Sequence, residues 1–429
     1  MKQDAYQQAQ KAVVEALESN AMELTFPHFW DSEDEESGIF QAFFKSLKQL
    51  KNLRFLDIQE YRFSTLPEWL TELTQLEALT CIDGRLETFP SFLYKLPNLK
   101  TLHLGGNKLT LIPESLGQFS QLETLNLSRN QITELPDTLG ELTNLKQIEL
   151  SQNKLTQLPD SIGQLTQLRS LHVYVNALTS IPDSLEQLTQ LEDLMVSDNQ
   201  LIALPISLGF LTALQNFDAS SNYLHTLPDS FGQLSQLQTL SIEHNEITEL
   251  PETMGKLNQL LLLDLSDNKL TTLPESLNRL TQLVKLYLTG NEFSTVPNAI
   301  RGMTHLNMLA LAGNQLTAVP DWIGELADLR ELYLSTNEIE TIPESIGQLN
   351  QLEILSCGGH KRSDHSYWGG DMMERHQFGN NIILLPSSIG YLPALKELDL
   401  QHNPLDSGLN LAYKQGLDAV KNYLRTHHV

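Results

Sequence analysis

Residues 122–144, LETLNLSRNQITELPDTLGELTN, show most clearly the pattern from which the fold can be predicted. Apolar residues fall at positions 1, 4, 6, 11, 14, 18 and 21 of this stretch, with Asn at position 9 and Pro at position 15. The pattern returns every 23 residues from Leu53 to Leu329. Position 9 is Asn in eleven successive copies, from Asn107 to Asn337, and fourteen of the eighteen prolines occupy position 15. Self-similarity at a fixed period of this length indicates a repeat protein.

The spacing within one copy predicts its local structure. Positions 4 and 6 point to one face of a short strand, so positions 3, 5 and 7 point the other way, toward solvent. The Asn at position 9 can bond backbone groups of the next turn, and stacked Asn side chains would form a ladder. Pro at position 15 suits the start of a short helical segment, because its missing N–H would lack a partner there. Gly is frequent at position 19, where we expect the backbone to turn back.

A single copy is too small to bury its own apolar face, so neighbouring copies must cover one another and build a continuous core along a parallel sheet. Strands spaced ~4.8 Å apart on one side, with bulkier helical turns on the other, make such an array curve. We therefore predict an α/β repeat solenoid. Its expected form is a horseshoe with a concave parallel β-sheet, short helical segments on the convex side and helical caps at both ends.

The consensus LxxLxLxxNxLxxLPxxLGxLxx resembles the 23-residue class of leucine-rich repeats. That class occurs in plant intracellular Ras-group repeat proteins, in animal Ras–Raf scaffold proteins, in Roco proteins and in many bacterial repeat proteins. The resemblance covers residues 21–405. It implies the leucine-rich-repeat horseshoe, and it implies binding of proteins, often small GTPases or their effectors, through the concave sheet. The partner itself depends on surface residues that the fold does not fix.

The two ends depart from the repeat and are predicted to be caps. Residues 1–52 would form an N-terminal helical cap with a degenerate first repeat, residues 53–405 the repeats, and residues 406–429 a C-terminal helical cap with a helix over 409–425. The first cap places four residues on one helical face: Tyr6, Ala9, Val13 and Leu17. The second cap turns four residues inward: Leu417, Val420, Tyr423 and Leu424.

One repeat, residues 352–394, is longer than the others because it carries an inserted loop at 358–379. Loops of this length in compact domains are usually functional or disordered. Six side chains of the loop are common metal ligands: His360, Asp364, His365, Asp371, Glu374 and His376. Their spacing matches no known ligand motif. We favour a polar partner-binding loop, with a metal site and a passive loop as the alternatives.

Composition limits the class of protein. Asp and Glu number 53 against 28 Lys and Arg, a formal charge of -25, so phosphate backbones and anionic membranes are poor partners. The N-terminus is too polar for a secretory signal, and the two cysteines, Cys81 and Cys357, exclude a disulfide scaffold. Both thiols are expected to be free core residues. We expect a cytoplasmic monomer that binds neither nucleic acid nor membrane.

Chemistry-bearing motifs are weak in this sequence. Cys81 precedes Asp83 as in the Cys-x-Asp of bacterial repeat-fused ubiquitin ligases, but it falls at core position 6. The sequence contains no GxxxxGK[ST] phosphate-binding loop, so any GTPase would be a separate protein. No catalytic residue, cofactor site or metal site is predicted.

Two groups of residues on the predicted concave face are candidate contact sites. The middle cluster consists of His172, Tyr174 and Met195. The apolar stripe alternates between positions 3 and 5 of five consecutive repeats: Leu262, Tyr287, Met308, Tyr333 and Ile354. Acidic residues surround both groups, so the predicted partner surface is basic: Asp193, Asp218, Glu243, Asp264 and Glu331. Tyr367 and Trp368 of the inserted loop would flank a bound partner on the apolar stripe, or else cover the stripe in the free protein.

These observations predict a non-catalytic protein-binding scaffold or adaptor in intracellular signalling, with a small GTPase or a kinase as the partner that the resemblance suggests. The alternative function is a receptor for a small ligand or a glycan held under the 358–379 loop.

Overall fold

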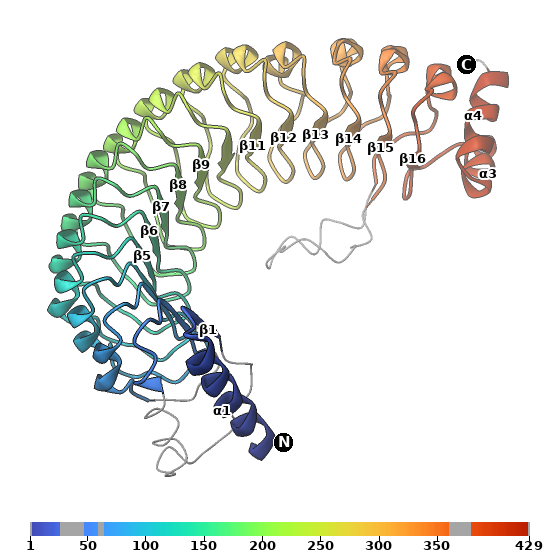
Figure 1. Cartoon of the computed structure of the whole chain (residues 1–429). Helices are drawn as coiled ribbons and strands as arrows, with labels where there is room; N and C mark the ends of the chain where they lie inside the picture. The colour runs from blue at the N-terminus through green and yellow to red at the C-terminus, as the bar shows by residue number, and fades with distance from the viewer. Residues whose placement is uncertain (1, 26–46, 59–63, 360–378, 428–429) are drawn as a thin grey trace. The chain divides into compact units, whose positions relative to one another are not determined.

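The computed structural model describes four stretches of the chain: 2–25, 47–58, 64–359 and 379–427. The chain falls into two compact units, Met1–Leu214 and Gln215–Val429. Within each unit the strands lie side by side along one side of the chain and the helical turns lie along the other (Figure 1). This division separates compact halves of the chain, whereas the predicted division separates caps from repeats. The predicted bounds of the caps stay a prediction.

The first unit begins with helix α1 (Lys2–Ser19) and continues with strands and short 3₁₀ helices in alternation. Its strands are β1 (Glu23–Thr25), β2 (Phe55–Asp57), β3 (Ala78–Thr80), β4 (Thr101–His103), β5 (Thr124–Asn126), β6 (Gln147–Glu149), β7 (Ser170–His172) and β8 (Asp193–Met195). Its 3₁₀ helices are η1 (Glu68–Glu72), η2 (Ser91–Lys95), η3 (Glu114–Gln118), η4 (Asp137–Glu141), η5 (Asp160–Gln164), η6 (Asp183–Gln187) and η7 (Ile206–Phe210).

The second unit repeats the alternation and ends in two helices, α3 (Ser407–Gln415) and α4 (Leu417–Thr426). Its strands are β9 (Asn216–Asp218), β10 (Thr239–Ser241), β11 (Leu262–Asp264), β12 (Lys285–Tyr287), β13 (Met308–Ala310), β14 (Glu331–Tyr333), β15 (Ile354–Ser356) and β16 (Glu397–Asp399). Its 3₁₀ helices are η8 (Asp229–Gln233), η9 (Glu252–Lys256), η10 (Glu275–Arg279), η11 (Asn298–Gly302), η12 (Asp321–Glu325), η13 (Glu344–Gln348) and η15 (Ser387–Tyr391).

Within each unit the strands pair in parallel and in sequence order, with equivalent repeat positions opposite one another. Thr101 faces Thr124 between β4 and β5, and Leu263 faces Leu286 between β11 and β12. All seven apolar positions of the 122–144 repeat are buried, none more than 9% exposed. The predicted repeat solenoid, with a parallel sheet and short helical segments, is confirmed.

Two details of the predicted strand face are wrong. Position 7 does not point to solvent in every repeat: Ser151 and Ser335 are buried there, because position 7 already belongs to the turn that leads to a left-handed residue at position 8. At position 5, Ala310 and Ser356 are also buried. Both lie opposite the large ring of Tyr333 in the sheet register, and we attribute their burial to that neighbour.

The position 9 asparagines join each repeat to the one before it. Asn130 Nδ2 donates to the carbonyl of Leu127 at 2.9 Å and to that of Leu104 at 3.0 Å, while its Oδ1 accepts from the N–H of Leu109 at 2.9 Å. The expected bonding to the turn is confirmed. The ladder, however, runs from side chain to backbone, because backbone groups of its own repeat and of the repeat before it already satisfy the amide of Asn130.

The helical turns follow the expected Pro, but the glycine after it has a different role from the one predicted. The carbonyl of Pro136 accepts from the N–H of Leu139 at 3.0 Å and so closes the first turn of η4. Gly140 lies inside this turn, and a Cβ there would come within 2.6 Å of the Ser161 carbonyl oxygen. Glycine at position 19 therefore permits close packing of successive turns and does not reverse the chain.

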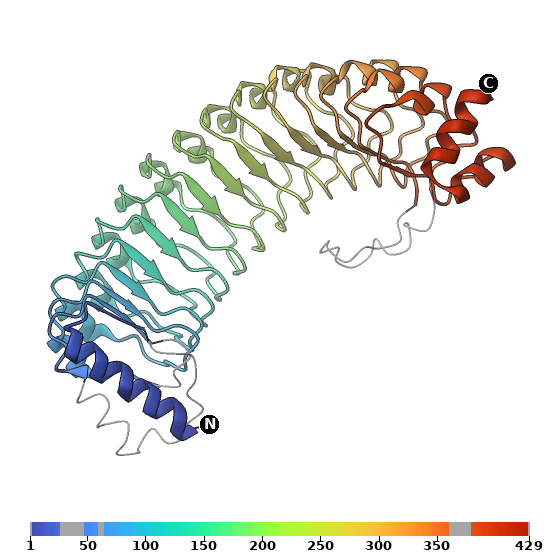
Figure 2. The ribbon, with the colours of Figure 1, turned by 45° about the vertical axis from the view of Figure 1, so that its right-hand side comes forward.

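The end of the chain contains two helices where the sequence predicted one over 409–425. Gly416 separates them with a φ of +106°, a backbone conformation that disfavours residues with a Cβ. Val420 and Leu424 are buried as predicted, whereas Leu417 and Tyr423 are only partly buried. Helix α4 packs against η15 at the end of the second unit (Figure 2).

At the other end of the chain, Val13 of α1 is buried and Leu17 is only partly buried. The side chains of Tyr6 and Ala9 lie outside the described residues.

Both cysteines are free and buried, as predicted. Burial raises the pKa of each thiol, that of Cys357 to about 12. The repeat pattern resumes after the inserted loop, because Asn380 Nδ2 donates to the Cys357 carbonyl at 2.8 Å and so takes the position 9 role. Residues 360–378, with the six candidate metal ligands and with Tyr367 and Trp368, lie outside the described residues.

Within the described ranges, no helix is both long and apolar enough to cross a membrane, and no group of three His, Cys, Asp or Glu side chains is arranged to hold a metal ion.

Candidate binding surface

The apolar stripe lies on the outward-facing side of five adjacent strands, β11 to β15. The register sets Leu262, Met308 and Ile354 in the row of position 3, alternating with Lys285 and Glu331. Tyr287 and Tyr333 stand in the row of position 5, with the small Ala310 between them. All five members of the stripe are half-buried. The structure thus places the predicted residues on one surface.

Hydrogen bonding orients one ring of the stripe. The Tyr333 hydroxyl donates to Glu331 Oε2 at 2.8 Å. Burial, together with this bond and the charge of Glu331, raises the pKa of Tyr333. Burial and the charges of Asp264 and Glu331 also raise the pKa of Tyr287. Both phenols therefore stay protonated at neutral pH and offer an apolar face with a polar tip, which suits a protein interface.

Carboxylates border the apolar stripe near the carboxyl ends of β10 and β11. Burial is the largest cause that raises the pKa of Asp264, and the charge of Asp218 adds to it. Burial also raises the pKa of Asp267 to about 7, with contributions from Glu243 and Asp264. Because these like charges disfavour one another's ionised form, a cation brought here by a partner would be stabilised.

The other border of the stripe contains residues that the sequence reasoning missed. Position 2 of the repeats is mostly charged and forms ion pairs between neighbours, such as Arg54 with Glu77 at 3.3 Å and Arg330 with Glu353 at 3.0 Å. Leu261 and Val284 occupy this position next to the stripe, and Leu261 is 43% exposed. The signal in the sequence was the presence of two aliphatic residues in a column that is otherwise charged or polar.

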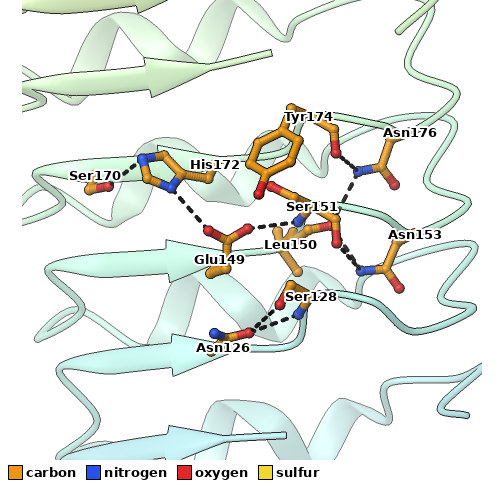
Figure 3. Close-up of polar contacts among 10 residues, drawn as sticks. All are labelled: Asn126, Ser128, Glu149, Leu150, Ser151, Asn153, Ser170, His172, Tyr174 and Asn176. Carbon is orange, nitrogen blue, oxygen red and sulfur yellow. Dashed lines mark hydrogen bonds and ion pairs between the residues drawn. The ribbon is translucent and has the colours of Figure 1, made fainter. Parts of the chain in front are cut away.

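The middle cluster lies in the first unit and is more polar than predicted (Figure 3). His172 Nδ1 donates to Glu149 Oε2 at 3.0 Å, and its Nε2 lies 3.0 Å from the Ser170 hydroxyl. The bond to Glu149 is the largest cause that raises the pKa of His172. Burial alone would raise the pKa of Glu149, but bonds from His172 and Ser151 outweigh it and lower that pKa. Tyr174 and Met195 are half-buried beside this network.

The order hydroxyl, imidazole, carboxylate is that of a nucleophile with its base and orienting acid. Acyl transfer also needs donors for an oxyanion. The Ser170 N–H is taken up by the sheet, where it donates to the Lys146 carbonyl at 3.1 Å, and Asp193 lies opposite Ser170 in the register. A carboxylate at that place opposes developing negative charge. The network therefore favours a structural or contact role.

Three family models match the chain. The model described as "Leucine-rich repeat region" matches residues 113–201 and 239–315. The model described as "Leucine rich repeat" matches residues 86–132, 189–247 and 304–358. The model described as "R13L1/DRL21 LRRs" matches residues 7–107. All three describe repeats, and none describes a catalytic domain. No curated protein sequence matches the chain.

Solved structures with the same architecture include a leucine-rich repeat protein of Leptospira interrogans. It is 29% identical, with 86% of this chain and 95% of that chain covered and a TM-score of 0.72. An internalin from Listeria monocytogenes is 24% identical, with 76% and 94% covered and a TM-score of 0.65, a similarity that concerns the fold alone. The Arabidopsis receptor kinase HAESA, solved in complex with the peptide hormone IDA and the co-receptor SERK1, is 25% identical, with 90% and 75% covered and a TM-score of 0.50.

Proposed function

Because the chain is a leucine-rich repeat protein, we propose that it binds a protein partner through the strand side of its second unit and acts as a non-catalytic scaffold or adaptor. The observation that carries the proposal is the apolar stripe: five half-buried apolar side chains on five adjacent strands, bordered by carboxylates. An apolar centre within a polar border is the usual composition of a protein interface.

The border favours a basic partner surface. Asp264 and Asp267 both have raised pKa values because burial and neighbouring carboxylates disfavour their charges. Lys or Arg groups of a partner would offset that repulsion on binding. The Arabidopsis receptor kinase of the same architecture supports a binding role in general, since it is solved with a peptide hormone and a second protein.

The finer parts of the proposal rest on the resemblance to the 23-residue repeat class and on composition. We propose a cytoplasmic monomer in intracellular signalling, with a small GTPase or a kinase as partner. The alternative, a small-ligand or glycan receptor, depends on the 358–379 loop, most of which lies outside the described residues.

The test compares affinity capture by the native chain and by the variant Tyr287→Ala/Tyr333→Ala. A partner held by the native chain should bind the double variant more weakly by at least ~2 kcal/mol, because truncated aromatic anchors commonly cost that much. Tyr223→Ala is the matched control, since Tyr223 is 53% exposed in the same unit but lies at position 10, outside the stripe. Equal binding by all three proteins, with unchanged circular dichroism, would refute the proposal. A thermal shift with metabolites or glycans and no protein partner would favour the alternative.

A further inference from the structure

Position 8 of the repeats has a left-handed backbone. In the first unit, two side chains at this position form an ion pair between repeats. Asp83, Gly106 and Arg129 occupy this position in three successive repeats, with φ values of +56°, +68° and +53°. Arg129 reaches back across Gly106, and its Nη1 lies 2.8 Å from Asp83 Oδ1. A Cβ on Gly106 would collide with that oxygen. An aspartate, a glycine and an arginine at position 8 of three successive repeats therefore form one arrangement, in which the glycine leaves room for the ion pair.

The second unit contains the same arrangement without its arginine. Asp267, Gly290 and Gly313 occupy position 8 of three successive repeats, with φ values of +51°, +69° and +66°. A Cβ on Gly290 would collide with Asp267 Oδ1, as in the first unit. The backbone bonds also correspond: the Asp267 N–H donates to the Thr289 carbonyl at 2.7 Å, and that of Gly290 to the Ala312 carbonyl at 2.8 Å. The third residue is Gly313, which has no side chain to offer.

The carboxyl group of Asp267 consequently lacks the cation that Asp83 has. Among the described residues, no donor bonds its buried Oδ1 atom. Its side chain is 16% exposed, against 39% for Asp83. Three ionisable groups face it: Glu243 and Asp264, which repel its charge, and His244, whose Nδ1 lies 4.0 Å from Oδ2. A carboxyl in this position gains more from an added cation than a solvated one does.

We propose that Asp267, Gly290 and Gly313 form a notch that receives an arginine side chain of the protein partner, in the place that Arg129 takes in the first unit. The inference rests on the proposed function for the existence of a basic partner. It adds the chemical group that is recognised and the residues that recognise it. The notch borders the apolar stripe, because Asp267 follows β11 and Gly290 follows β12, the strands that supply Leu262 and Tyr287.

Proton release accompanies such binding. With a pKa of about 7, Asp267 is roughly one tenth ionised at pH 6 and roughly nine tenths ionised at pH 8. The guanidinium selects the ionised form, so its affinity should rise about tenfold over this range. His244 Nδ1 lies 4.0 Å from Asp267 Oδ2, and the variant His244→Gln shows how much the imidazole contributes to this pH dependence. Gln152 occupies the same repeat position with φ +57°, so glutamine is compatible with this backbone.

The first test supplies the missing arginine within the chain. Gly313→Arg copies Arg129, which has the same left-handed backbone. Unfolding is measured by urea for the native chain, Gly313→Arg, Asp267→Asn and the double variant. Gly313→Arg should lower the unfolding equilibrium constant about tenfold more when Asp267 is present than when it is replaced. Thr336→Arg is the control, because the residue two repeats before it is Gly290 and not an aspartate. A coupling no larger than the control's would overturn the proposal.

The second test measures binding of acetyl-Gly-Arg-Gly-amide by NMR, through the amide signals of Gly290 and Gly313, with the uncharged citrulline peptide as control. The arginine peptide should bind about tenfold tighter at pH 8 than at pH 6, in the native chain and in His244→Gln. Binding should be lost in Asp267→Asn and in Gly313→Arg. Equal binding of both peptides, or binding unchanged in those two variants, would overturn the proposal.

Two further proteins separate the possible failures. Tyr287→Ala/Tyr333→Ala should keep the peptide affinity, so loss of a partner in that variant concerns the proposed function alone. Replacement of Lys361, Arg362 and Arg375 by Gln removes the cations of the 360–378 segment. Unchanged peptide affinity in this variant supports a partner's arginine, whereas a marked rise would assign the notch to the chain's own segment and overturn the proposal.

Discussion

Asp267→Asn should stabilise the protein more at pH 8 than at pH 5. Burial and the charges of Glu243 and Asp264 raise the pKa of Asp267 from 3.8 to about 7. The folded state then binds more protons than the unfolded state between these values. The stabilisation from this group is therefore complete below pH 3.8 and is lost as the pH rises through 7. Asparagine is neutral throughout and tolerates the left-handed backbone as well as aspartate does.

The size of the effect on the free energy of unfolding follows from the difference between the pKa values of Asp267 in the folded and unfolded states. Between pH 5 and pH 8 the native chain should lose up to about 3 kcal/mol through Asp267, at about 1.4 kcal/mol for each pH unit up to 7. Solvent screens a side chain that is 16% exposed, so we expect Asp267→Asn to gain about 1–2 kcal/mol at pH 8 relative to its effect at pH 5.

Urea unfolding of both proteins at the two pH values gives the difference, and side-chain NMR gives the pKa of Asp267 directly. Asp198→Asn is the control, because Asp198 has the same left-handed backbone but is exposed. The effect of Asp267→Asn should change with pH more steeply than the effect of this control. If Asp267→Asn has the same effect at pH 5 and pH 8, or destabilises the chain at pH 8, the carboxyl is not held in the environment described.

Three other changes test the fold and the middle cluster. Leu265→Ala removes a fully buried side chain and should cost about 2–5 kcal/mol in urea unfolding; a cost below ~0.5 kcal/mol would contradict the repeat register. Asn268→Ala leaves the N–H of Ile247 and the carbonyl of Ile242 without their bonds at 3.0 Å each, so it should cost at least ~2 kcal/mol, whereas a neutral result would show that water replaces the amide. Glu149→Gln removes the largest cause of the raised pKa of His172, so NMR titration should find a lower value, and an unchanged pKa would show that the bond is absent in solution.

The repeat itself was predictable because each position has one physical task. Burial selects Leu125 and Leu127, backbone bonding selects Asn130, and the first helical turn selects Pro136; each task leaves a mark at a fixed spacing. Where two structural roles select the same residue type, the sequence could not distinguish them. Gly140 is small because Ser161 packs closely against it, but a glycine that turns the chain would look the same in the sequence.

The candidate site was predictable only in part. The register of 23 placed Tyr287 and Tyr333 on one surface, since position 5 lies on the side of the strand opposite the core positions 4 and 6. It could not show that His172 is held by Glu149 and Ser170, because side-chain rotamers decide which neighbours bond. The notch at Asp267 could not be predicted either. It depends on the left-handed backbone at position 8 and on the absence of an arginine at Gly313, two repeats further along the chain.

The most direct test of the central claim, that a protein partner binds the apolar stripe, is photo-crosslinking from within the stripe. Met308→benzoylphenylalanine and Tyr223→benzoylphenylalanine are irradiated in the same cell extract, since both side chains reach the surface of the second unit but only Met308 belongs to the stripe. We predict that one protein is crosslinked from residue 308 and not from residue 223. The same adducts from both residues, or an adduct from residue 223 alone, would contradict the claim.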